Sequence, residues 1–378
     1  MRGPDRAAPA AHREDIASPD EEAVGAAETA RGRPVSAEAA TLVSQILDLS
    51  EVKGNRGLLR DLFATAISLA DGTPTRLDLK IASAALAEMA MAFRLFGPFR
   101  GIPKLTIFGS ARTKPDDPVY EQARELAARL AAKGFMVVTG AGPGIMAAGT
   151  EGAGPEMAIG VDIRLPFESI PHPELAAEGR LVEMKYFFTR KLMLMKESAA
   201  FAVLPGGFGT LDECFELLTL LQTGKAEPAP IVLVDIPGEL YWESWESFVG
   251  GQVIRKGLAG PQDAAFYKIT DDVDVAVEEI LGFYRNYHSR RFVGEVMVVR
   301  LRLAPNDDEL AVLNERFSDC CSARGIWRTE PLGPERADRD HLELPRVALE
   351  LNLKLQGRFR QLIDALNEIE GDAGSTRR

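Results

Sequence analysis

The chain has 378 residues, of which 46% are hydrophobic and 26% are charged, and its formal net charge is −12 at pH 7. This length suits two domains or one large domain with appendages, and the composition is ordinary for a globular protein. The acidic balance argues against nucleic-acid binding as the main role, because a phosphate backbone needs a basic footprint. A small anionic ligand in a local positive site remains compatible with it.

Cysteine content and hydropathy predict the compartment. The chain has three cysteines, and the adjacent Cys320 and Cys321 are poorly placed for a structural bridge, so a reducing environment is expected. No apolar run approaches the roughly 20 residues that span a bilayer, and the N-terminus lacks the apolar core of a signal peptide. We therefore expect a soluble cytoplasmic protein with no membrane partner.

The first hundred residues fall into two parts. Residues 1–35 are rich in Ala, Pro, Gly and charged residues, which predicts a disordered tail. Residues 36–99 show helical periodicity, with Leu42, Ile46 and Leu49 forming one apolar stripe. No charged constellation here suggests chemistry, so this helical extension is expected to serve as a packing or oligomer surface.

Residues 100–285 alternate between short apolar strands and amphipathic helices. We expect strands at 105–108, 135–138, 158–163, 201–204 and 231–234, and helices at 120–132, 190–198, 211–221 and 242–249. This rhythm predicts an α/β fold, a Rossmann-like, doubly wound parallel sheet covered on both faces. Ligand sites in such sheets lie at the carboxyl ends of the strands.

Residues 286–378 change rhythm. Strands are expected at 295–303, 325–329 and 345–351, with helices at 308–323 and 357–369. This order predicts a small C-terminal α+β domain, with a ferredoxin-like arrangement as one candidate. Its role stays open between structure or assembly and the binding of a regulatory ligand.

A glycine-rich turn joins the strand at 201–204 to the next helix. Pro205 ends the strand, and Gly206, Gly207 and Gly209 allow a sharp turn and the close approach of a ligand. Thr210 then occupies the position expected for a helix N-cap. The unpaired N–H groups and the positive dipole end of the following helix favour phosphate.

A carboxylate follows this turn and has two readings. Glu213 lies close to the predicted phosphate site, which suggests chemistry on the sugar of a nucleotide. Thr210 and Glu213 also fit the S/T-x-x-E capping box, in which the glutamate only satisfies a backbone N–H. Spacing alone leaves both readings open.

Two further turns end strands of the predicted sheet. The segment that contains Gly142 and Gly144 is not a G-x-G-x-x-G fingerprint, because Ile145 stands where the last glycine is needed, and there is no P-loop motif. It is either a tight strand-to-helix turn or a nucleotide-contacting turn. Gly109 and Ser110 end the first strand, where they either line the same site or form a simple turn.

Two adjacent cations, Arg190 and Lys191, lie at the apparent start of the helix at 190–198. Positive charge there opposes the helix dipole, and a bound anion would offset that cost. A pair of solvated surface charges is the alternative. No Cys/His cluster has metal-ligand spacing, so neither a metal nor an organic cofactor is expected.

Three motifs together resemble the LOG family, named for the plant "lonely guy" proteins, whose members have often carried the label lysine decarboxylase. They are the signature Pro205–Glu213, the turn Thr139–Met146 and Thr189-Arg190-Lys191, and the resemblance covers roughly residues 100–285. It implies hydrolysis of a nucleoside 5′-monophosphate to a free base and ribose 5-phosphate. It also implies catalytic roles for Glu213 and Arg190, and assembly into a homo-oligomer.

One motif departs from the short plant-type members. They carry Met-His-x-Arg-Lys where this chain has Phe187-Phe188-Thr189-Arg190-Lys191, so base preference is expected to differ if the histidine selects substrate. Tyr186, Phe187 and Phe188 are expected in the core rather than stacked on a base. The terminal extensions look like those of longer bacterial members, so nucleotide salvage is at least as well supported as cytokinin production.

Other functions remain as alternatives. Proteins of similar fold bind phosphorylated pterin cofactors without turnover, so a non-catalytic nucleotide or cofactor carrier, or a nucleotide sensor, is the competing reading. Amino-acid decarboxylation is disfavoured, because nothing marks a Schiff-base lysine with a partner for a pyridinium nitrogen. The sequence does not choose between AMP, other monophosphates and isopentenyladenosine monophosphate.

Overall fold

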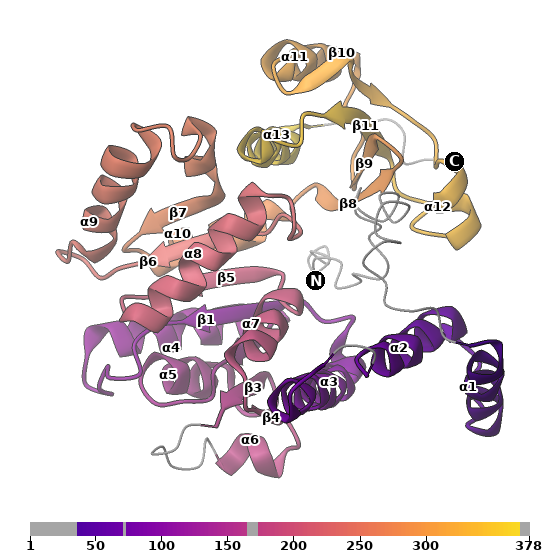
Figure 1. Ribbon diagram of the computed structural model, residues 1–378. Helices are drawn as coiled ribbons and strands as arrows, with labels where there is room; N and C mark the ends of the chain where they lie inside the picture. Colours follow the sequence, from indigo (N-terminus) through magenta and orange to yellow (C-terminus); the bar gives the residue numbers. More distant parts are fainter. Residues whose placement is uncertain (1–35, 71–72, 165–172, 371–378) are drawn as a thin grey trace, which may run out of the picture. The chain divides into compact units, whose positions relative to one another are not determined.

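The computed structural model describes residues 36–70, 73–164 and 173–370 (Figure 1). The predicted disordered tail, residues 1–35, lies outside this range. The N-terminal helices are α1 (Ala37–Leu49), α2 (Arg56–Ser68) and α3 (Arg76–Phe96), followed by the 3₁₀ turn η3 (Gly97–Phe99). The chain divides into two compact units inside α3, so that everything from Glu88 onward belongs with the central sheet. The predicted domain boundary at 99/100 stays a prediction.

The apolar stripe expected on α1 does not form a buried face. Leu42, Ile46 and Leu49 are exposed, whereas Val43 and Leu47 are the buried residues of this helix. A use of the stripe as an oligomer surface remains a prediction. Across the described part of the chain, no helix combines the length and the apolar character needed to cross a bilayer.

The central sheet has seven strands that all run parallel. They are β1 (Lys104–Phe108), β2 (Met136–Thr139), β3 (Ala158–Ile163), β4 (Leu181–Met184), β5 (Ala200–Val203), β6 (Ile231–Val234) and β7 (Tyr267–Thr270). Their order is β4-β3-β2-β1-β5-β6-β7. The predicted Rossmann-like α/β fold is confirmed, with two edge strands, β4 and β7, that the sequence pattern did not indicate.

Helices cover both faces of this sheet. They are α4 (Pro118–Ala131), α5 (Ile145–Ala153), α6 (Pro173–Ala177), α7 (Phe187–Lys196), α8 (Phe208–Gln222), α9 (Tyr241–Phe248), the π-helical turn η4 (Val249–Ile254), the 3₁₀ segment η5 (Pro261–Phe266) and α10 (Val273–Phe283). Successive strand residues point to opposite faces: Ile107 packs with α4, α5 and α10, and Phe108 packs with α7, α8 and α9. Each face therefore has its own apolar core.

The strand order creates a switch point between β1 and β5. The chain builds outward from β1 through β2 and β3 to β4, then returns through α7 to β5 on the other side of β1. Ligands of open parallel sheets bind in the crevice at the carboxyl ends of the strands where this reversal occurs. The loops after β1 and β5 are therefore the first place to look for a site.

The C-terminal part forms a second sheet of four antiparallel strands, in the order β10-β11-β9-β8. Its elements are β8 (Tyr287–Val293), β9 (Val296–Leu301), α11 (Asp307–Phe317), β10 (Cys321–Arg328), α12 (Gly333–Asp338), β11 (Arg346–Leu351) and α13 (Gln356–Glu368). β11 lies between β9 and β10, which is the split β-α-β order of ferredoxin-like units, with β8 added beside β9. The predicted small α+β unit is present.

Two details of that prediction are wrong. β8 was not expected, because its sequence carries Arg290 and Arg291 and lacks apolar alternation. Arg290 is nevertheless buried, because Glu227 pairs with it at 3.3 Å. The helix expected to reach residue 323 ends at Phe317, since β10 begins at Cys321 and pairs with β11.

Candidate active site

The loop after β5 turns directly into α8. Gly207 is the N-cap of this helix, and Phe208 is its first residue. Thr210 is therefore the third residue of α8, and the predicted N-cap at Thr210 is wrong. Glu213 lies in the second turn, so the capping-box reading of Thr210 and Glu213 is wrong as well, and the carboxylate is not used to satisfy the helix start.

Packing requires glycine at one position of this loop but not at the other two. A Cβ atom on Gly206 would collide with the side chain of Thr210, so this position needs glycine for packing. A Cβ atom on Gly207 or Gly209 would meet no atom within 4 Å. Neither of these two residues has a positive φ, so the turn itself does not require them, and their missing side chains leave open space at the start of α8.

Three loops meet at the carboxyl edge of the sheet. The N–H of Ser110, after β1, donates to Pro205 O at 3.2 Å, and its carbonyl accepts from the N–H of Ile145 at 3.0 Å. Gly144 takes φ +67° beside the backbone of Ser110, a conformation and an approach that favour glycine. The loops after β1, β2 and β5 are thus tied together through Ser110.

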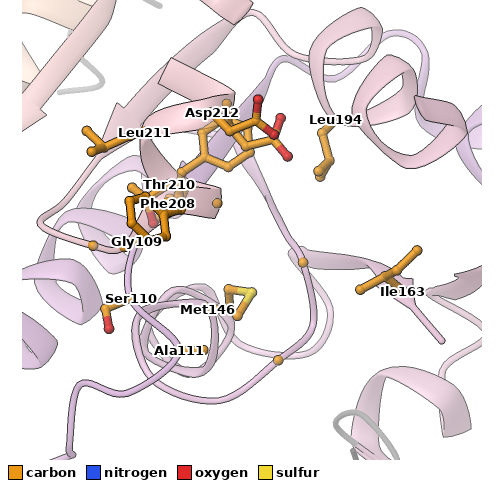
Figure 2. Close-up of a pocket in the computed structure, with 18 of the residues that line it drawn as sticks. Gly109, Ser110, Ala111, Met146, Ile163, Leu194, Phe208, Thr210, Leu211 and Asp212 are labelled. Carbon is orange, nitrogen blue, oxygen red and sulfur yellow. The ribbon is translucent and has the colours of Figure 1, made fainter. Parts of the chain in front are cut away.

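These loops line one cavity of about 740 Å³, within the range of roughly 300–1,000 Å³ typical of small-molecule sites. Figure 2 shows Ser110, Phe208 and Thr210 on one side of it and Ile163 and Leu194 on the other. Nine of the eleven predicted site residues line it: Gly109, Ser110, Gly142, Arg190, Gly206, Gly207, Gly209, Thr210 and Glu213. Gly144 and Lys191 do not.

Two backbone carbonyl groups, one in β3 and one after β2, fix the side chain of Arg190. Arg190 lies in the first turn of α7, whose helix starts at Phe187 rather than at 190. Its Nε donates to Val161 O of β3 at 2.9 Å, and its Nη2 donates to Gly140 O after β2 at 3.2 Å. A planar guanidinium held at two points has a defined orientation.

Lys191 turns toward α8 instead. Its Nζ lies 2.6 Å from Asp212, 2.8 Å from Glu216 and 3.8 Å from Glu213. Burial lowers the pKa of Lys191, but the hydrogen bonds to Asp212 and Glu216 and the charges of Glu213 and Glu216 together outweigh that effect, so its pKa lies above the usual value. Lys191 is therefore a fixed positive charge behind the cavity wall.

Glu213 is a buried carboxylate at this cavity, only 6% exposed. Burial raises the pKa of Glu213 to about 7, against the opposing charges of Lys191 and Arg190. Its Oε2 has no hydrogen-bond partner among the described residues. A buried carboxyl group poised near neutral pH can exchange a proton with a ligand or with water.

The aromatic residues of α7 are not in the core. Phe187 and Phe188 are each 54% exposed, and Phe187 lines the cavity, so the expectation of core positions is wrong for both. Phe188 stacks on Tyr186 with ring centroids 5.6 Å apart. Phe188, which replaces the histidine of the plant-type members, therefore presents its ring to solvent next to the cavity residue Phe187.

Glu88 contributes to the site through α7, and sequence analysis missed it. This buried carboxylate of α3 accepts from the hydroxyl of Thr189 at 2.5 Å and from the N–H of Lys185 at 3.1 Å. It thereby fixes the helix start that carries Arg190. Glu88 is 101 residues from Thr189 in the chain, and no local pattern links the two.

We expect Glu88→Ala to destabilise the chain and to displace Arg190. The substitution removes the acceptor of the Lys185 and Tyr186 N–H groups, at about 1–3 kcal/mol per group, while the Thr189 hydroxyl can still donate to Tyr186 O at 2.9 Å. Thermal unfolding should show a lower Tm than wild type, while Glu88→Gln, which keeps an acceptor, should lose less. An unchanged Tm for the alanine variant would contradict this role.

Comparisons with known proteins agree with the sequence motifs. The family model described as "Possible lysine decarboxylase" matches residues 140–280. A rice (Oryza sativa subsp. japonica) protein named probable cytokinin riboside 5′-monophosphate phosphoribohydrolase is 32% identical over 146 residues, which cover 37% of this chain and 65% of the relative. The chain therefore spans just under two thirds of that relative's length.

Two further comparisons are with proteins from other groups of organisms. A Mycobacterium tuberculosis protein named cytokinin riboside 5′-monophosphate phosphoribohydrolase is 29% identical over 161 residues, covering 42% of this chain and 83% of the relative. The solved structure of a molybdenum cofactor carrier protein from Chlamydomonas reinhardtii aligns with 20% identity and a TM-score of 0.33, covering 48% of this chain and 98% of that one. The resemblance to the LOG family that the three motifs predict is confirmed for the Rossmann-like part of this chain.

Proposed function

We propose that this chain hydrolyses the N-glycosidic bond of nucleoside 5′-monophosphates, giving a free base and ribose 5-phosphate. The observation that carries the proposal is Glu213, a buried carboxyl group with a pKa of about 7, in the same cavity as Arg190 and the glycine loop that begins α8. The names of the rice and mycobacterial relatives support the same reaction class.

The loop Gly206–Thr210 would hold the 5′-phosphate. The first N–H groups of α8 have no partner within the helix, and the helix dipole places partial positive charge there. Gly207 and Gly209 leave space for the phosphate oxygens to approach. Binding at this end of the substrate, away from the reacting carbon, orients the ribose.

Glu213 and Arg190 would act on the ribose. As the bond from C1′ to the base nitrogen breaks, its electron pair leaves with the base and the ribose becomes oxocarbenium-like. The Glu213 carboxylate stabilises that positive charge and takes a proton from the water that attacks C1′, as carboxylates do in glycoside hydrolysis. Arg190 holds ribose hydroxyls or phosphate in paired hydrogen bonds. The leaving base takes up a proton from the solvent, the attacking water supplies the hydroxyl at C1′, and Glu213 returns its proton to the solvent.

The proposed reaction does not specify which base is released or which biological role the reaction serves. AMP, other monophosphates and isopentenyladenosine monophosphate all fit the proposed chemistry. Nucleotide salvage, a homo-oligomeric state and a cytoplasmic location remain predictions from sequence. The loop Gly206–Thr210, Glu213 and Arg190 act on the sugar and the phosphate of the substrate. Base preference is therefore set by other contacts and is read from base release.

Base release from a panel of nucleoside 5′-monophosphates tests the function, with the matching nucleosides as controls. Release from monophosphates alone supports the proposal and gives the base preference. A folded chain that binds monophosphates and releases no base from any of them would overturn it in favour of a carrier or sensor.

Alanine substitutions at two adjacent glycines should separate folding from binding. Gly206→Ala meets the side chain of Thr210 and is expected to lower both Tm and affinity for ribose 5-phosphate. Gly207→Ala meets no protein atom, so its Tm should fall less than that of Gly206→Ala, by only the small cost of alanine at an N-cap, while the affinity falls. Thermal unfolding and calorimetric titration measure the two effects. Wild-type affinity in Gly207→Ala would contradict phosphate binding at this loop.

A further inference from the structure

Tyr241 contacts the glycine loop from a neighbouring element. It is the first residue of α9, which follows β6, and it lines the same cavity as Glu213. Its hydroxyl donates to the carbonyl oxygen of Gly206 at 2.7 Å. This is a side-chain contact to the backbone of the proposed phosphate loop from outside both the loop and α8.

Tyr241 is itself firmly anchored. The N–H of the next residue, Trp242, donates to Asp235 Oδ2 at 3.1 Å, and the Trp242 indole donates to Val234 O at 3.2 Å. Trp242 is fully buried, and the rings of Tyr241 and Trp242 meet edge to face with centroids 4.9 Å apart. The hydroxyl of Tyr241 therefore has a defined position relative to the end of β6.

The peptide that Tyr241 holds joins two glycines. Glycine has no Cβ to restrict its backbone, so the plane of the Gly206–Gly207 peptide can rotate at low cost. In a planar trans peptide the C=O and the following N–H point in opposite directions. A hydrogen bond that fixes Gly206 C=O toward Tyr241 therefore also fixes Gly207 N–H on the opposite side of the peptide.

We propose that Tyr241 is a positioning residue that locks the Gly206–Gly207 peptide in the orientation that binds the 5′-phosphate. The inference rests on the proposed function, since it assumes that this loop binds phosphate. Tyr241 itself touches the loop backbone and not the reacting bond. Its removal is expected to weaken the phosphate contact specifically, because the rest of the cavity keeps its shape.

The test is Tyr241→Phe in the full chain, titrated calorimetrically with ribose 5-phosphate and with ribose. The ring and its contact with Trp242 remain, and only the hydroxyl is lost. Affinity for ribose 5-phosphate should fall roughly tenfold, as expected for one lost hydrogen bond that orients a donor, while affinity for ribose and the Tm should change little. Tyr267→Phe is the matched control, because Tyr267 contacts Trp245 on the same face but does not line the cavity.

Each outcome decides between the two proposals. Wild-type affinity for ribose 5-phosphate in Tyr241→Phe overturns the positioning role and leaves hydrolysis standing. An equal loss of affinity for ribose, or a large drop in Tm, also overturns it, because a general structural role then explains the effect. Phosphate-specific loss of binding in a chain that releases no base supports the positioning role and contradicts the proposed reaction. Failure of wild type to bind ribose 5-phosphate overturns the positioning role, because the loop then does not bind the phosphate, whereas the proposed reaction is decided by base release.

Discussion

Glu213→Gln is expected to lower the rate of base release by about 10²–10⁴-fold, the usual contribution of a positioned acid or base. Glutamine keeps the size of the side chain but can neither take a proton from water nor balance positive charge on the ribose. Wild-type activity should rise with pH through about 7, because the ionised carboxylate is the active form. Steady-state rates measured from pH 5 to pH 9 check both expectations.

Glu216→Gln is the matched control for that experiment. Glu216 lies three residues further along α8 and also contacts Lys191, but it is not part of the cavity wall. Its substitution should leave the rate within severalfold of wild type. Equal losses in the two variants would mean that the charge around Lys191, and not the Glu213 carboxylate, supports the reaction.

The same Glu213→Gln substitution is expected to stabilise the fold. Burial raises the pKa of Glu213 from 4.5 to about 7, so the folded chain binds more protons than the unfolded chain between these pH values. The free energy of unfolding therefore falls as pH rises across this window. At about 1.4 kcal/mol per pH unit, ionised Glu213 costs the folded chain about 3 kcal/mol at pH 8.

Thermal unfolding of both proteins at several pH values tests this cost. Glu213→Gln should unfold several degrees above wild type at pH 8, and the difference should shrink toward pH 4.5, where the wild-type carboxyl is protonated. A destabilising charge that is retained in a buried cavity is typical of a functional site. Equal Tm values at pH 8 would contradict the buried, poised carboxyl group.

The repeating units of the fold were readable from the sequence because strands and helices bury apolar faces with different periods. The strands 158–163 and 231–234 agree with the structure at both ends. The edge strands β4 and β7 were missed because each is only four residues long and carries a charged residue, Glu183 or Lys268, which interrupts the apolar run typical of a buried parallel strand. Edge strands are half-exposed, so their sequences are weaker signals.

The sequence predicted those residues of the site that belong to short sequence motifs. The glycine loop, Arg190 and Glu213 come together in one cavity, as their places at strand ends indicated. Glu88 and Tyr241 could not be found in the same way, because each acts on the site through a contact with a distant segment. Thr210 was misplaced because a glycine N-cap leaves no side-chain signal, and threonine was the nearest residue with a capping side chain.

Arg190→Lys is expected to lower kcat by about 10²-fold, the usual effect of misplacing a catalytic group by about 1 Å. Lysine keeps the positive charge but cannot bridge Val161 O and Gly140 O with a planar fork. The charge of Arg190 also lowers the pKa of Glu213, so a charge-preserving change should leave the acidic limb of the pH–rate profile near its wild-type position.

Arg190→Met separates orientation from charge. It should lose at least as much rate as Arg190→Lys, and its acidic limb should move to higher pH, because Glu213 loses a cation that favours its ionised form. Arg129→Lys, on the exposed face of α4, is the control and should match wild type. An acidic limb that stays in place in Arg190→Met would show that Arg190 does not act on Glu213. A wild-type kcat in Arg190→Lys would show that the reaction needs only its charge, and the two carbonyl contacts would then serve the fold alone.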